Sequence, residues 1–193
     1  MNSSPMRHPR VLASLEIVRN PVEPSHRSAI RSIAIFTVTR CPEWGAQFAS
    51  EHYAFERETK RSDIIEGIAK SVPANATLIC KARPGPYHHL RKAMAGIPFP
   101  PSDLQLIQRL RGDLDIVPIE CRETALNETA AAYAIRRAGP GSSTLAQARR
   151  AADEAQVLWL TFLASCCRDG DRTTLGSAFQ AWRAIEQARP LPF

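Results

Sequence analysis

Three stretches near the start of the chain have the alternating pattern of β-strands. In residues 11–18, one set of alternate positions is wholly apolar, and the other set includes Ser14 and Glu16. As a strand, this stretch would therefore place both polar side chains on one face. Residues 29–39 are rich in Ile, Val, Thr and Phe, and residues 47–56 alternate loosely. We expect these three strands to form an antiparallel meander.

Helical and strand patterns alternate in the middle of the chain. A helix is expected to begin at Asp63, with Glu66 as its capping-box partner, and Pro73 would end it. The continuous apolar run of residues 76–80 follows directly and predicts a buried parallel strand. The first helix is expected to bury one face, at Ile64, Ile65, Ile68 and Val72. Two short helices are expected at 90–95 and 104–111, and a last strand at 114–119.

The remaining third of the chain is expected to be helical. Residues 125–137 form a first helix that ends before Gly139. Two further helices, 144–164 and 174–188, carry apolar stripes that place Trp159, Phe179 and Trp182 in the core. The order of elements predicts an α/β fold with a mixed sheet. We divide the chain into a flexible arm (1–10), one domain (11–168) and a C-terminal helical extension packed on it (169–193).

Composition adds charge and redox information to this picture. The 193 residues carry a formal net charge of +6, with many more Arg than Lys. The guanidinium group of arginine matches the geometry of phosphate, which favours a polyanionic partner. A solvated basic surface is an equally open interpretation of the same charge. The five cysteines form no CxxC pair, which favours reduced thiols and a cytoplasmic location. No apolar run is long enough to cross a bilayer, so no membrane association is expected.

Ser14 and Glu16 are the first residues that point to chemistry. Two acids at this spacing would begin a two-metal phosphodiester site, because both carboxylates would face the same cation. Here a hydroxyl takes the first position. The strand therefore carries only half of such an acidic pair.

Several strings, in this order, resemble the DnaQ-like (DEDD) 3′–5′ exonucleases of the ribonuclease H-like superfamily. The string VLASLEIVRNPVEP is similar to that family's first strand, and IRSIAIFTVTR to its second. DIIEGIAKSVPANATLICKARPGPYHHL resembles the helix and strand before its second Asp, LDIVPIE a further strand, and RRAADEAQVLW the closing helix. The resemblance implies a ribonuclease H-like mixed five-stranded sheet flanked by helices, with an extra C-terminal helix.

The resemblance also implies roles for particular residues. The family's first Asp falls on Ser14, whereas its Glu is retained as Glu16. The last Asp falls on Glu154, and the general-base His falls on Arg149, which cannot accept a proton. The second Asp falls on His88, which follows Tyr87 in the aromatic position.

The implied chemistry is metal-dependent hydrolysis with degenerate motifs. Glu16 and Glu154 are the expected ligands of Mg²⁺ or Mn²⁺ if the protein is active, and His88 is a candidate base. Glu154 could instead pair with Arg150 four residues away on a helix. The expected nucleic-acid-binding residues are Ser14, Tyr87, Arg149 and Arg150.

Three functions remain open from the sequence. The first is a 3′–5′ exonuclease-like protein that binds single-stranded DNA or another nucleic acid, with weak or lost hydrolysis. The second is a pseudoenzyme that binds the nucleic-acid backbone through arginines. The third is a non-catalytic protein-interaction subunit that uses the same fold.

Overall fold

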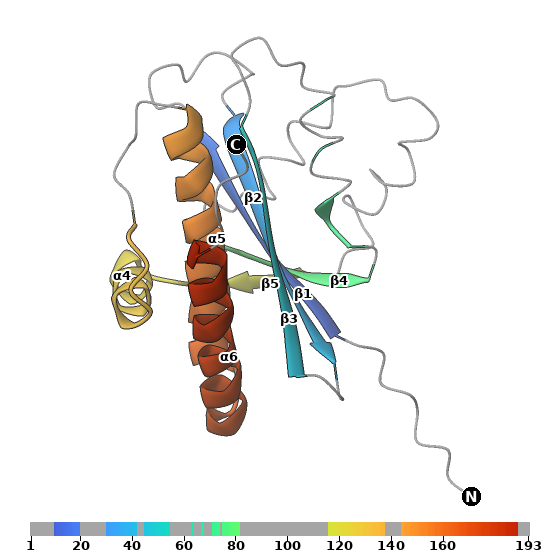
Figure 1. Cartoon of the computed structure of the whole chain (residues 1–193), viewed down its shortest axis with the longest axis vertical. Coiled ribbons are helices and arrows are strands. Elements are labelled where there is room, and N and C mark those ends of the chain that lie inside the picture. The colour runs from blue at the N-terminus through green and yellow to red at the C-terminus, as the bar shows by residue number, and fades with distance from the viewer. Residues whose placement is uncertain are drawn as a thin grey trace, which may run out of the picture.

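The computed structural model describes residues 10–19, 30–41, 45–54, 63, 67, 71–73, 75–81, 116–137 and 144–188. The described ranges contain five strands and three helices with defined bounds (Figure 1). The strands are β1 (Arg10–Arg19), β2 (Ile30–Cys41), β3 (Gly45–Ala54), β4 (Ala76–Lys81) and β5 (Ile116–Ile119). The helices are α4 (Glu123–Ala132), α5 (Thr144–Cys166) and α6 (Asp169–Ala188).

The strands form one mixed sheet in the order β3-β2-β1-β4-β5. β2 pairs antiparallel with both β1 and β3, so the expected meander is confirmed. β4 runs parallel to β1, and β5 runs parallel to β4. Continuous apolar sequence explains β4, whose first five residues are all buried. The α/β class expected from the sequence is thus confirmed.

Among the described helices, α5 covers most of one face of the sheet. It packs on β1, β2, β3 and β4, and Figure 1 shows α4, α5 and α6 gathered on one side of the sheet. Its buried positions include Ala151, Ala155 and Trp159, which recur every four residues as an amphipathic helix requires. The opposite face of the sheet is also buried, at Ile33 and Ile35 for example.

An aromatic cluster joins α6 to this core. The ring centroid of Phe179 lies 5.8 Å from those of both Phe36 and Trp159, and 6.0 Å from that of Phe48. Trp182 packs against Phe36 at 5.4 Å. The expected core positions of Trp159 and Phe179 on the helix stripes are confirmed, whereas Trp182 is half-buried and packs against this core. The boundary between domain and extension stays a prediction.

The first helix of the C-terminal third differs from its expected range of 125–137. α4 ends at Ala132, and Ala134 has a left-handed backbone with φ of 52°. The N–H of Ala134 donates to Ala131 O at 3.1 Å, and that of Ile135 donates to Ala130 O at 2.8 Å. These two bonds form a Schellman cap, which usually contains glycine at the left-handed position. As a result, Arg137 lies beyond the helix and is free to turn toward α5.

Other expectations are only partly covered by the described residues. Val72 is buried, as expected for the helix that begins near Asp63. The isoleucine side chains of that helix, and the helices expected at 90–95 and 104–111, lie outside the described residues. Within the described part of the chain, no helix is long and apolar enough to span a membrane.

Candidate functional site

Ser14 holds the middle strand of the sheet against α5. Its side chain is fully buried, and its hydroxyl donates to the carbonyl oxygen of Ala155 at 2.6 Å, with the carbonyl oxygen of Phe36 at 3.4 Å. Alternation along β1 directs Ser14 to the α5 side, and Ala155 directly follows Glu154. Two of the residues expected at the site are therefore brought together at the β1–α5 contact.

The surroundings of Ser14 suit a hydrogen-bond donor and not an anion. Among the described residues, the two hydrogen-bond partners of its hydroxyl are both carbonyl oxygens, so an ionised carboxylate at this position would meet two acceptors. We expect Ser14→Ala to cost about 1 kcal/mol of unfolding free energy and Ser14→Asp about 2 kcal/mol. Urea unfolding at neutral pH measures both values. A Ser14→Asp protein as stable as wild type would contradict this assignment.

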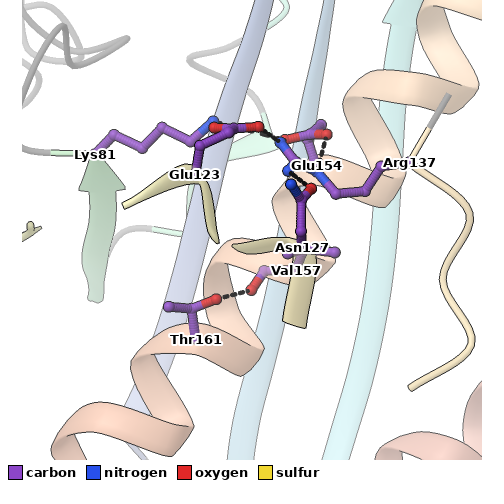
Figure 2. Close-up of polar contacts among 7 residues, drawn as sticks. All are labelled: Lys81, Glu123, Asn127, Arg137, Glu154, Val157 and Thr161. Atoms are coloured by element: carbon purple, nitrogen blue, oxygen red, sulfur yellow. Dashed lines mark hydrogen bonds and ion pairs between the residues drawn. The ribbon is translucent and has the colours of Figure 1, made fainter. Parts of the chain in front are cut away.

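Glu154 is neutralised inside the protein by Arg137. The Glu154 side chain is 7% exposed, and the guanidinium of Arg137 forms a bidentate ion pair with its carboxylate. Arg137 Nε donates to Glu154 Oε1 at 2.7 Å, and Nη2 donates to Oε2 at 2.8 Å. Lys81 Nζ, at the end of β4, lies 3.6 Å from the same Oε2. Figure 2 shows the carboxylate enclosed between these two cations.

Arg137 also fastens α4 to this ion pair. Its guanidinium pairs with Glu123 at 2.6 Å and donates to Asn127 Oδ1, both on α4 (Figure 2). The arrangement depends on the Schellman cap at Ala134, because a continuing helix would carry Arg137 away from α5. One arginine thus connects α4, α5 and the segment between them.

The electrostatics of Glu154 reflect this enclosure. Burial raises its pKa, but the hydrogen bond from Arg137 and the charges of Lys81, Arg137 and Arg150 lower it more, so the net shift is downward. The same hydrogen bond raises the pKa of Arg137. Glu154 is therefore ionised and paired at neutral pH.

A pH dependence of stability follows from the lowered pKa of Glu154. A carboxyl group whose pKa is lower in the folded state stabilises the fold above its unfolded pKa. This stabilisation is lost as the pH falls through the folded pKa. We expect the stability advantage of wild type over Glu154→Gln to shrink below about pH 4.3, the ordinary pKa of Glu. Urea unfolding at several pH values measures this difference, and a pH-independent difference would contradict the pairing.

Burial raises the pKa of the neighbouring Asp153, although Arg183 opposes the shift. Protonation of Asp153 therefore stabilises the folded state at acidic pH, so its effect on stability has the opposite pH dependence to that of Glu154. Asp153 is present in both wild type and Glu154→Gln. Most of its contribution therefore cancels in their comparison, apart from the smaller part of the raised pKa of Asp153 that comes from the charge of Glu154.

The two expected phosphate-binding arginines lie on the first half of α5. Arg149 is exposed and Arg150 is half-buried. The ion pair expected between Arg150 and Glu154 is replaced by the pair with Arg137, although the charge of Arg150 still acts on Glu154. Asp153, on the same helix, lies 3.4 Å from Arg183 of α6. Among the described residues around this part of α5, cations therefore outnumber acids.

The remaining expected site residues are less fully described. Glu16 lies in β1, where its backbone pairs with Ala34, and the structure describes no more of it than this. Tyr87 and His88 lie outside the described residues. Their expected roles stay predictions.

The described residues do not fit the expected divalent-metal site. Both oxygens of Glu154 already accept hydrogen bonds from Arg137, and Ser14 donates its only hydrogen to a carbonyl oxygen. Within the described ranges, no group of three or more His, Cys, Asp and Glu side chains is placed to hold a metal ion. The carboxylate that would bind a cation binds a guanidinium in its place.

Arg137 and Lys81 are the residues of this site that the sequence patterns did not indicate. Arg137 is 17 positions from Glu154 and belongs to no motif with it. Lys81 could have been suspected from the sequence, because it is the last residue of β4. β4 runs parallel to β1, so the C-terminal ends of the two strands lie at the same edge of the sheet.

No protein-family model matches the chain, and no curated protein matches it.

Proposed function

We propose that this chain is a nucleic-acid-binding protein of the ribonuclease H-like, exonuclease-like kind in which hydrolysis has been lost. The observation that carries the proposal is the two-pronged pairing of Arg137 with Glu154. The resemblance places a metal-binding carboxylate at Glu154, and in this protein an arginine of the chain supplies the positive charge. The mixed sheet, with an antiparallel meander followed by parallel strands, supports the same descent.

The charge around Glu154 supports binding of phosphates. Lys81, Arg137 and Arg150 all act on this one carboxylate, and Arg149 lies exposed one position before Arg150. Arginine forms hydrogen bonds to phosphate in a fixed fork geometry, and each phosphate contact releases counterions from the nucleic acid. Binding through Arg149 and Arg150 would thus be strong at low salt and insensitive to base sequence.

Binding of labelled single-stranded DNA, followed by fluorescence anisotropy over a range of salt concentrations, tests this proposal. We expect saturable binding whose affinity falls steeply with salt. In the Arg149→Ala/Arg150→Ala variant, the slope of log affinity against log salt should become shallower by about one for each lost phosphate contact. The matched control is Arg172→Ala, an exposed arginine of α6 that pairs with Asp169. No binding at low salt, or equal slopes in the two variants, would overturn the proposal.

A further inference from the structure

A cavity of about 340 Å³ lies between the sheet and the junction of α5 with α6. Leu12 and Val38 line it from the sheet, Trp159 and Phe162 from α5, and Leu175 from α6. Its size is within the range of small-molecule pockets, roughly 300–1,000 Å³. On α5 its lining begins at Trp159, five residues beyond Glu154, which corresponds to roughly 8 Å along the helix. The cavity is therefore separate from the site around Glu154.

The polar groups at this cavity restrict the charge of a ligand. Arg40 and Asp171 both line it and form an ion pair at 2.5 Å. The two charges cancel, so a charged ligand would gain little unless it broke this pair. A neutral molecule can occupy the apolar space and leave the pair intact.

Trp159 supplies a second, independent indication. Its indole Nε1 is the one buried side-chain nitrogen or oxygen without a hydrogen-bond partner among the residues that the structure describes. A buried donor without an acceptor is unfavourable, and buried tryptophan N–H groups usually have a partner. The indole is fully covered, so a neighbouring side chain must rotate before an acceptor can reach its N–H.

We propose that this cavity binds a small, neutral, largely apolar molecule that carries one hydrogen-bond acceptor, such as a ketone or ester oxygen. The apolar walls bind the body of the molecule. The N–H of Trp159 donates a hydrogen bond to the acceptor. This inference does not depend on the proposed function.

Two near-isosteric probes test the proposal: acetophenone, which has a carbonyl acceptor, and isopropylbenzene, which has none. Binding is followed through the tryptophan indole ¹H–¹⁵N signals, with the Trp159 signal assigned by its loss in Trp159→Phe. We expect saturable binding of both probes, and the ratio of acetophenone affinity to isopropylbenzene affinity should be about fivefold higher in wild type than in Trp159→Phe, the value of one net hydrogen bond. Acetophenone alone should shift the Trp159 N–H signal strongly.

Two variants separate the acceptor from the cavity. Trp159→Phe keeps the apolar wall and lacks the N–H, so it should bind isopropylbenzene about as wild type does and acetophenone more weakly than wild type, because the buried ketone oxygen then has no donor. Leu175→Trp should fill the cavity and abolish binding of both, whereas Ser177→Trp, at an exposed position on the same helix, should bind like wild type. The proposal is overturned by a lack of saturable binding in wild type or by the same ratio of the two affinities in wild type and in Trp159→Phe. Undiminished binding in Leu175→Trp would also overturn it.

Discussion

Replacing Arg137 by Met is expected to lower the unfolding free energy by about 3 kcal/mol, the lower end of the cost of breaking a buried ion pair. The methionine keeps the apolar stem but leaves Glu154, 7% exposed, without its two strongest hydrogen bonds. Lys81 remains at 3.6 Å and limits the loss, which is why the lower end applies. Urea unfolding followed by circular dichroism measures the change.

The double variant Arg137→Met/Glu154→Leu distinguishes a lost pair from a damaged fold. With both charges removed, neither side of the Arg137–Glu154 pair is left as an unpaired buried charge. Lys81 loses the carboxylate 3.6 Å from its ammonium, but it is 21% exposed, so stability should return to within about 1 kcal/mol of wild type. The control Arg172→Met makes the same substitution at an exposed pair and should change stability by less than about 0.5 kcal/mol. Single and double variants whose losses simply add would contradict a direct Arg137–Glu154 interaction.

Phe179→Ala is expected to cost about 4 kcal/mol of unfolding free energy. The ring is fully buried between α6 and the sheet, and its removal leaves a cavity that Phe36, Phe48 and Trp159 cannot fill. The effect is large because the lost apolar transfer energy and the lost packing act together.

Ile185→Ala is the matched control for Phe179→Ala, since it truncates an apolar side chain of the same helix that is 60% exposed. We expect a change below about 0.5 kcal/mol. Thermal or urea unfolding of both variants provides the comparison. Similar small losses in the two would show that α6 does not belong to the cooperative core.

Periodicity was sufficient to predict the sheet and the helical core. β1, β2 and β4 follow directly from alternating or continuous apolar sequence, and the stripe that contains Trp159 identified the buried face of α5. These features depend on near neighbours in the chain. An alternating or helical apolar pattern can bury its apolar side chains in only one kind of element, so the pattern itself identifies the element and its buried face.

The ion pair could not be predicted because it depends on a turn with no local signal. Ala134 takes the left-handed conformation that normally favours glycine, and so α4 ends five residues before its expected end at Arg137. The neighbour rule for helices favoured Arg150 as the partner of Glu154. The actual partner is brought in from another segment by the packing of α4 on α5.

Incubation of the protein with end-labelled single-stranded DNA in Mg²⁺ or Mn²⁺ tests the central claim most directly. The claim is that Arg137 holds Glu154 in place of a metal ion. Binding without shortening of the strand, in both wild type and Glu154→Gln, is the predicted result. Metal-dependent shortening by wild type that Glu154→Gln abolishes would contradict it.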